Sequence, residues 1–339
     1  MQIIYKIKKQ CTWLLFPLAI LYWGIIFLRN LFYDLNLFTT HKAPCKIISV
    51  GNISTGGTGK TPTVIYLCSL LKNHGKKVAV LSRGHGRATK GLLLVSKGNG
   101  PLCKWGDCGD EPFMLSENLF DVPILVDENR YRGSLYLLKH FTPEVIIMDD
   151  GFQHRSLNRD LDIVLVDGGM HINDHKLLPQ GLLREPWHHI KRADVIIITK
   201  KQPEPLLQRR LMETHIPTLQ TRIIPSIVYH KQNLNLEISQ NEKCYIVTGI
   251  GNSQFFKTTV KRLGHDFIGY EIFPDHFNYS KTDLINIENN AKKAGATCIL
   301  TTQKDWVKLR ELSPRYSFGI IDIRIRASNE NLFLKLIKP

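Results

Sequence analysis

The sequence predicts an α/β protein with a mostly parallel β-sheet flanked by helices, and three observations lead to this prediction. Short apolar runs rich in β-branched residues recur between residues 46 and 198, which is typical of strands buried on both faces. Helical or loop stretches separate these runs, as the crossovers between parallel strands require. Polar clusters follow several runs directly, at the strand ends where such sheets bind their ligands.

The first run, residues 46–50, leads through a glycine-rich turn into a predicted helix that begins near Pro62. The turn consists of Ser54, Thr55, Gly56, Gly57, Thr58, Gly59, Lys60 and Thr61. Glycines allow several backbone N–H groups to point at one place, where the helix N-terminus adds positive potential. Lys60 supplies a charge for the β- and γ-phosphates, and the Thr61 hydroxyl supplies a ligand for Mg²⁺. The order predicts a phosphate-binding loop and a P-loop NTPase-like fold, although the standard pattern has glycine at position 54.

Further strands are predicted at residues 77–81, 123–126, 144–148, 162–167 and 194–198, with a hairpin around 92–95 and a helix opening at 109–112. Asp149 directly follows one of these runs, where phosphate-loop enzymes carry a Mg²⁺-holding carboxylate. Asp150 adjoins it, and adjacent carboxylates repel each other unless a cation lies near. We therefore expect Thr61, Asp149 and Asp150 to hold Mg²⁺; two solvated turn residues are the alternative. Residues 199–202 lack the Asn and Asp that guanine recognition needs, which disfavours GTP.

Beyond residue 223 the pattern changes to shorter strand candidates, at 244–247 and 296–300, and to helices near 253–264 and 281–294. We expect three parts. They are an N-terminal membrane-associated helical segment (1–38), a phosphate-loop core domain (39–222) and a smaller C-terminal α/β domain (223–339) that closes over the active site.

Residues 11–28 carry no charge and lie between a lysine-rich start and Arg29. A signal peptide would need a small-residue cleavage site, which does not follow. A transmembrane helix is possible, since 18 residues lie at the short end of the spanning range, but Pro17 interrupts the run. We favour an uncleaved helix in the cytosolic leaflet, because Trp13, Tyr22 and Trp23 suit the membrane interface. A buried core helix is the remaining alternative.

The composition points to anionic partners. The 45 Lys and Arg residues outnumber the 30 Asp and Glu residues, which leaves a formal net charge of +15. The basic residues are scattered and no nucleic-acid-binding motif is present, so a membrane surface or a phosphorylated substrate is favoured over nucleic acid. Seven irregularly spaced cysteines indicate free thiols in a reducing cytosol.

Several motifs, in order along nearly the whole chain, resemble those of the tetraacyldisaccharide 4'-kinases, the lipid A 4'-kinases of Gram-negative bacteria. They are the loop at 51–62, Ser-Arg-Gly-His-Gly-Arg at 82–87, Gly-Asp-Glu-Pro at 109–112, Asp-Asp-Gly-Phe-Gln-His at 149–154, Gln-Gly-Leu-Leu-Arg-Glu at 180–185, Asp-His-Phe at 275–277 and Thr-Thr-Gln-Lys-Asp at 301–305. Ser54 is usual for that family, whereas His85 and Ser253 stand where the family generally carries Tyr and Pro.

The resemblance implies a kinase that transfers the γ-phosphoryl group of ATP, with Mg²⁺, to the 4'-hydroxyl of a lipid disaccharide 1-phosphate at the inner membrane. It implies that Asp110 is the catalytic base, paired with His276 across the interdomain cleft. From spacing alone Asp110 would merely cap a helix. Lys60 is the third catalytic candidate. The implied substrate-binding residues are Arg83, Arg87, Glu111, Arg130, Gln153, His154 and Arg184.

Two other functions stay open from the sequence. A phosphate-loop kinase or ligase for a small soluble metabolite would leave residues 11–28 unexplained. A non-catalytic, nucleotide-gated membrane-binding protein would leave Asp110 and His276 without a task.

Overall fold

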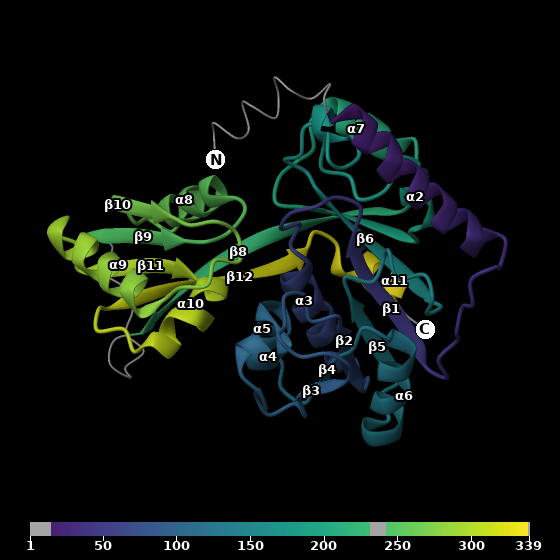
Figure 1. The fold of residues 1–339 in the computed structure, drawn as a ribbon, viewed down its shortest axis with the longest axis horizontal. Coiled ribbons are helices and arrows are strands. Elements are labelled where there is room, and N and C mark those ends of the chain that lie inside the picture. The colour runs from purple at the N-terminus through teal and green to yellow at the C-terminus, as the bar shows by residue number, and fades with distance from the viewer. Residues whose placement is uncertain (1–14, 231–241, 338–339) are drawn as a thin grey trace.

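A computed structural model describes residues 15–230 and 242–337. The described strands form one 12-stranded sheet in the order β10-β9-β11-β12-β8-β7-β6-β1-β5-β2-β4-β3 (Figure 1). The strands are β1 (Lys46–Asn52), β2 (Val78–Ser82), β3 (Leu93–Ser96), β4 (Ile124–Val126), β5 (Val145–Asp149), β6 (Leu161–Asp167), β7 (Val195–Thr199), β8 (Thr218–His230), β9 (Cys244–Thr248), β10 (Phe267–Ile272), β11 (Cys298–Thr302) and β12 (Phe318–Ala327). The helices are α2 (Phe16–Asp34), α3 (Lys60–Asn73), α4 (Trp105–Cys108), α5 (Asp110–Asn118), α6 (Arg130–Phe141), α7 (Pro205–Met212), α8 (Ser253–Arg262), α9 (Lys281–Lys293), α10 (Gln303–Leu309) and α11 (Glu330–Ile337), with short 3₁₀ turns η1 (Ile172–Asp174), η2 (Trp187–Arg192) and η3 (Arg310–Leu312).

Strands β1 to β7 and the helices between them form what we call the large lobe. All adjacent strands from β4 to β8 in the sheet run parallel, which confirms the predicted fold class. The central strands are continuously buried, as their uniform apolar composition requires. The parallel arrangement brings the carboxyl ends of β1, β2 and β5 to one edge of the sheet.

Strand β3 corrects the hairpin expected around residues 92–95. It pairs antiparallel with β4, which lies beyond α4 and α5 in the sequence, and not with a neighbouring segment. Val95 is fully buried in the same apolar cluster as Ile124 and Val126 of β4. The pairing of β3 with β4 is therefore decided by the burial of the apolar side chains of β3, and not by a local turn.

The small lobe contains β9, β10 and β11 with α8, α9 and α10. The two lobes are joined by β8 and β12, which form a long antiparallel ribbon (Figure 1). Because β8 also pairs with β7, and β12 with β11, the sheet continues from one lobe into the other. The expected domain boundary at residues 222 and 223 falls inside β8 and stays a prediction.

The C-terminal helix α11 packs on the large lobe. Phe333 and Ile337 are buried in its main apolar cluster, and the Phe333 ring stacks on Tyr66 of α3 with centroids 5.9 Å apart. Lys46 at the start of β1 donates to the Ile337 carbonyl over 2.9 Å. The end of the chain thus contributes to the core that supports the phosphate loop.

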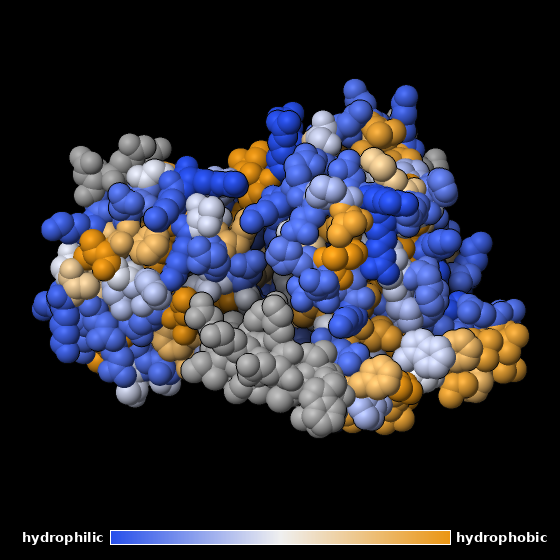
Figure 2. All heavy atoms as spheres, turned by 90° about the horizontal axis from the view of Figure 1, so that it is seen from above, coloured by the Kyte–Doolittle hydropathy of each residue, from blue (hydrophilic) through white to orange (hydrophobic). Residues whose placement is uncertain are grey.

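Helix α2 carries most of the predicted membrane-associated segment, of which residues 1–14 lie outside the described residues. It has 19 residues, and an 18-residue window of it has a mean hydropathy of 1.4 with 11% of the window buried, so by length and composition the helix could cross a membrane. Phe16, Leu21, Ile25 and Leu28 are each more than half exposed. Figure 2 shows apolar side chains gathered at the lower right, where α2 lies along the large lobe.

Candidate functional site

Two glycines shape the loop between β1 and α3. Gly56 and Gly59 have φ values of +100° and +88°, a region that side chains other than glycine rarely adopt. Gly59 is the N-cap of α3, so the loop ends at a helix N-terminus, as a phosphate site requires. Ser54 instead forms an antiparallel bridge with Leu183. Its backbone is not in the glycine region, which explains why this position does not need glycine.

The rest of the loop is held by neighbouring segments. The Thr55 N–H donates to the Leu182 carbonyl over 2.7 Å, and the Thr199 hydroxyl donates to the Thr58 carbonyl over 2.8 Å. Apart from its two chain neighbours, no described residue has a heavy atom within 4 Å of the place that a Cβ on Gly57 would take. The loop is therefore braced from behind and open in front, where a polyphosphate would lie.

Lys60, Asp150 and Arg184 form a charged cluster at the loop. The Lys60 ammonium lies 3.5 Å from the Asp150 carboxylate, and the Arg184 guanidinium lies 3.1 Å from both Asp150 oxygens. Burial alone would raise the pKa of Asp150, but the Lys60 and Arg184 charges lower it, so the carboxylate is ionised. Asp150 has φ of +52°, an uncommon backbone conformation that aims its side chain at these two cations.

Asp149 is buried at the end of β5 and has the chemistry of a cation ligand. Its Oδ2 accepts from the Ser82 hydroxyl over 3.1 Å, whereas its Oδ1 is buried and finds no partner among the described residues. Burial and the Glu111 and Asp150 carboxylates raise the pKa of Asp149 to about 7. A divalent cation bound here would give the buried Oδ1 a partner and offset the repulsion among the three carboxylates.

The donor set fits Mg²⁺ held jointly by protein and nucleotide. Within residues 15–230 and 242–337 there is no group of three or more His, Cys, Asp or Glu side chains able to hold a metal alone. Mg²⁺ commonly binds one or two carboxylates and completes its shell with substrate phosphates and water. Asp149 and the Thr61 hydroxyl, at the first turn of α3, match that pattern. Asp150 is already paired with two cations, so it is the weaker of the predicted ligands.

Arg130 interacts electrostatically with Asp149 and Asp150, and His154 interacts with Arg130. Arg130 is 2% exposed and donates to the Asp127 carbonyl. Burial, and then repulsion from Arg83, lower its pKa to about 10, against the attraction of Asp149 and Asp150. Burial and the Arg130 charge lower the pKa of His154 to about 4, so this imidazole is neutral.

The polar side chains of α2 (Tyr22, Arg29 and Asn30), which we call its polar seam, attach this otherwise apolar helix to the same site. The Tyr22 hydroxyl donates to the Arg184 carbonyl over 2.7 Å, and Arg29 donates to the Gln153 carbonyl. The Gln153 amide in turn donates to the carbonyl of Asn52, at the end of β1, over 2.9 Å. The helix expected to meet the membrane thus contacts the backbone of two predicted substrate-binding residues.

Buried charges continue this seam. Asn30 of α2, 4% exposed, donates to Glu185 over 3.1 Å, and Arg192 lies 2.8 Å from the same carboxylate. His189 Nδ1 is 2.8 Å from Glu185. Burial alone would raise the pKa of Glu185, but His189 and Arg192 lower it to about 2. An ionised carboxylate, held through its Oε2 by Asn30, His189 and Arg192, therefore fixes α2 to the loop that carries Arg184.

Asp110 and His276 meet, as the sequence analysis predicted. Asp110 is the first residue of α5, and its Oδ2 lies 3.1 Å from His276 Nδ1, although 166 residues separate the two. The same oxygen lies 2.9 Å from the Lys308 ammonium. Lys304 lies 3.0 Å from His276 Nε2 and 3.1 Å from Asp275. The catalytic roles of Asp110, His276 and Lys60 stay predictions, but the contact between the two lobes is confirmed.

The other predicted substrate ligands differ in their surroundings. Arg83 is exposed at the end of β2, and Glu111 lies close enough to Asp149 to raise its pKa. Arg87 is committed elsewhere, because it pairs with Glu128 and donates to the Gly91 carbonyl over 2.6 Å. Its role in phosphate binding therefore has the least support.

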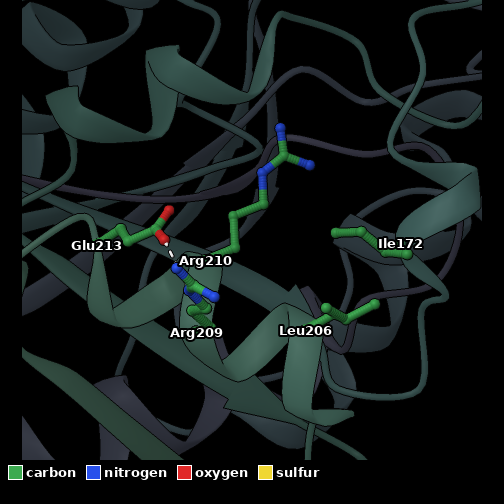
Figure 3. A pocket seen from close by; sticks show the side chains of 5 residues that line it. All are labelled: Ile172, Leu206, Arg209, Arg210 and Glu213. Atoms are coloured by element: carbon green, nitrogen blue, oxygen red, sulfur yellow. Dashed lines mark hydrogen bonds and ion pairs between the residues drawn. The ribbon is translucent and has the colours of Figure 1, made fainter.

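A separate open pocket of about 340 Å³ lies against α7 (Figure 3). Ile172, Leu206, Arg209, Arg210 and Glu213 line it, and Arg209 pairs with Glu213 over 3.3 Å. Arg210 contacts His175 and the Trp187 ring instead. None of these side chains is a predicted site residue, and we assign the pocket no role.

Four features together are typical of a phosphate-loop phosphotransferase: a braced glycine loop at a helix N-terminus, a lysine beside it, a carboxylate suited to Mg²⁺ and an Asp–His pair formed between the two lobes. Comparison with known proteins gives the family. The family model of the tetraacyldisaccharide-1-P 4'-kinases matches residues 11–338, and the chain belongs to that family.

Individual relatives agree over most of the chain. The tetraacyldisaccharide 4'-kinase of Chlorobaculum tepidum is 37% identical over 310 residues, 90% of this chain and 88% of the relative. That of Aquifex aeolicus is 36% identical over 325 residues, 95% and 97% of the two chains. The crystal structure of the Aquifex aeolicus protein LpxK in complex with ATP superimposes with a TM-score of 0.77 at 33% identity, covering 96% of this chain and 98% of that one.

Sequence reasoning missed Asn30, Lys304 and Lys308. Lys304 lies within the motif at 301–305, which could have suggested it. Lys308 lies one helical turn beyond that motif, and Asn30 is a single polar residue after an apolar run. Nothing in the sequence marks either one, because their partners are distant in the chain.

Proposed function

We propose that this chain transfers the γ-phosphoryl group of ATP to the 4'-hydroxyl of a lipid A disaccharide 1-phosphate precursor, forming lipid IVA, at the cytosolic face of the inner membrane. Membership of the 4'-kinase family supports the reaction. The position of α2 is the observation that best supports a lipid substrate. Its apolar face is exposed, while Tyr22 and Arg29 on its polar seam bind the carbonyls of Arg184 and Gln153.

The loop from Ser54 to Thr61 binds the polyphosphate through its backbone N–H groups, and Lys60 neutralises charge on the transferred group. Thr61 and Asp149 hold Mg²⁺, which when bound offsets negative charge on the phosphate oxygens. Asp150 keeps Lys60 and Arg184 in place through its two ion pairs. These residues prepare the donor side of the reaction.

Asp110 orients the acceptor hydroxyl and takes its proton. A bond forms between the 4'-oxygen and the γ-phosphorus, the bond from that phosphorus to ADP breaks, and the proton moves to the carboxylate late in the reaction. His276 Nδ1 faces Asp110, and its Nε2 is occupied by Lys304. These contacts support a proposal in which His276 orients the base and Asp110 accepts the proton.

Arg83, Arg130, Arg184, Gln153, His154 and Glu111 are proposed to surround the phosphates of nucleotide and acceptor. Arg184 has the strongest support, since it touches both the Asp150 cluster and α2. A planar guanidinium can pair with phosphate through two parallel hydrogen bonds. Arg87 belongs to the proposal only through its motif.

Label transfer tests this function. The protein is incubated with γ-labelled ATP, Mg²⁺ and the acylated disaccharide 1-phosphate in detergent micelles, and label in the lipid fraction is measured. The deacylated disaccharide 1-phosphate is the matched control. We expect transfer to the acylated acceptor and a much higher KM for the deacylated one. Absence of transfer to the lipid would overturn the proposal, and equal use of both acceptors would favour a kinase for soluble metabolites.

A further inference from the structure

The contact between the lobes contains a buried cation that the proposed mechanism has not used. Lys308, on α10, is 4% exposed. A buried lysine is costly unless its charge is paired and its N–H groups find acceptors. The groups that pair with the Lys308 ammonium therefore indicate its role.

The Lys308 ammonium makes its two polar contacts among the described residues next to the Asp110–His276 pair. It is 2.9 Å from Asp110 Oδ2 in the large lobe and donates over 3.1 Å to the carbonyl of Phe277, the residue after His276, in the small lobe. It also lies 5.3 Å from the centre of the Trp105 ring, on α4. One side chain thus ties the carboxylate of one lobe to the backbone that carries the imidazole of the other.

Helix α10 is itself anchored so that Lys308 can hold this position. Asp305, 2% exposed, accepts hydrogen bonds from the Gly249 N–H at 3.1 Å and from the Tyr279 hydroxyl at 3.0 Å. It is also bonded to the Thr302 hydroxyl at 2.6 Å. These bonds fix the first turn of α10 against β9 and the segment after β10, so Lys308 projects from a rigid helix.

We propose that Lys308 is a positioning residue of the phosphoryl-transfer reaction, which holds Asp110 and His276 together and turns the carboxylate so that Oδ1 faces the acceptor hydroxyl. This role rests on the proposed function. Lys308 and His276 both bind Oδ2. Among the residues that the structure describes, no hydrogen bond to Asp110 Oδ1 is found. Because two groups bind Oδ2 and none of the described residues binds Oδ1, the orientation of the carboxylate is fixed, and Oδ1 is available to the acceptor hydroxyl.

The charges around Asp110 agree with this role. The groups that face it are Lys308 and Lys304 from α10 and His276 from the segment after β10; the His85 ring lies 6.1 Å from that of His276, and Asp275 pairs with Lys304. Burial alone would raise the pKa of Asp110, but the hydrogen bonds from His276 and Lys308 and the Lys308 charge lower it. The carboxylate is thus kept ionised and ready to accept a proton.

The test uses the full-length protein and the lipid acceptor, with Lys308→Met and Lys308→Arg compared across pH. Lys308→Met keeps an unbranched side chain that is one atom shorter and removes its charge. We expect kcat to fall roughly 10- to 100-fold with little change in KM for ATP, because Asp110 loses its fixed direction. The acidic limb of the pH–rate profile should move to higher pH, because Asp110 then loses the Lys308 hydrogen bond and charge that help to lower its pKa. Lys308→Arg should recover part of the rate and keep the wild-type limb.

Arg310→Met is the matched control. Arg310 also joins the lobes, through a 2.5 Å ion pair with Glu117 of α5 and a contact with the Phe113 ring, but it touches neither Asp110 nor His276. Looser lobe contact alone would therefore slow Arg310→Met as much as Lys308→Met. Such equality, or a Lys308→Met variant with an unshifted acidic limb, would overturn the role of Lys308.

Two further comparisons keep the outcomes separate. Should Lys308→Met fail to fold, Asp110→Asn/Lys308→Met leaves no unpaired buried ion. Its rate should equal that of Asp110→Asn, and a clearly slower double variant would show that Lys308 acts elsewhere. A wild-type protein without transfer to lipid would overturn the proposed function and this role with it, whereas an active wild type with an equally active Lys308→Met would overturn the role alone.

Discussion

Replacing Asp110 with Asn removes the proposed base while keeping its shape. General-base catalysis contributes roughly 10²- to 10⁴-fold, so we expect kcat to fall by that factor. At about 1.36 kcal/mol for each tenfold change, the loss is roughly 3–5 kcal/mol of transition-state stabilisation. Asp110→Ala is the poorer choice, because it would also leave a gap beside the buried Lys308 ammonium.

His276→Ala should act through the same carboxylate. It removes one of the two groups that bind Asp110 Oδ2, at 3.1 Å. A hydrogen bond to a charged group contributes roughly 1.5–3 kcal/mol, so we expect a rate loss of roughly 10- to 150-fold. Because His276 orients a base that Asp110→Asn has already removed, the double variant should be hardly slower than Asp110→Asn.

The assay is the initial rate of label transfer to the lipid acceptor at saturating ATP and lipid, with thermal unfolding measured for each variant. Melting temperatures separate a lost base from a lost fold. Fully additive losses in the double variant would refute the pair as one unit. A wild-type rate for Asp110→Asn would return Asp110 to the role of helix cap.

The other predictions concern the phosphate loop, α2 and the Glu185 cluster that holds α2. Lys60→Ala should lower kcat by orders of magnitude in the same assay while the melting temperature stays close to wild type, and Thr61→Ala should raise the Mg²⁺ concentration needed for half-maximal rate; normal turnover in both would exclude this loop as the phosphate site. Tyr22→Phe should leave sedimentation with vesicles unchanged but slow transfer, because it frees the Arg184 carbonyl while the apolar face stays intact; an unchanged rate would mean that α2 acts as an anchor alone. Glu185→Gln should lower the free energy of unfolding measured in urea at pH 7. A Glu185 pKa of about 2 in place of 4.5 corresponds to roughly 3 kcal/mol of stability, which is present above pH 4.5 and lost as the pH falls towards 2. The difference in unfolding free energy between variant and wild type should therefore shrink in acid.

Much of the large lobe was predictable because its signals are local. Strand, loop and helix around residues 46–73 are adjacent in sequence, and apolar runs define buried strands wherever they pair. The pairing of β3 with β4 was not predictable in this way, since it depends on which apolar face the fold can cover. The packing of α11 on the large lobe was not predictable for the same reason: it depends on the burial of Phe333 and Ile337 next to α3 and β1, which are distant in sequence.

The candidate site divides along the same line. The phosphate loop, Asp149 and the apolar character of α2 follow from the sequence by itself, since each depends on residue types in one short segment. Motif resemblance added Asp110 and His276, but spacing alone could not have paired residues so far apart. Only the tertiary structure decided that Lys308 joins them and that Asn30 locks α2 to Glu185. Each of these is a buried polar group, and such a group is stable only where distant elements of the fold bring its partners to it.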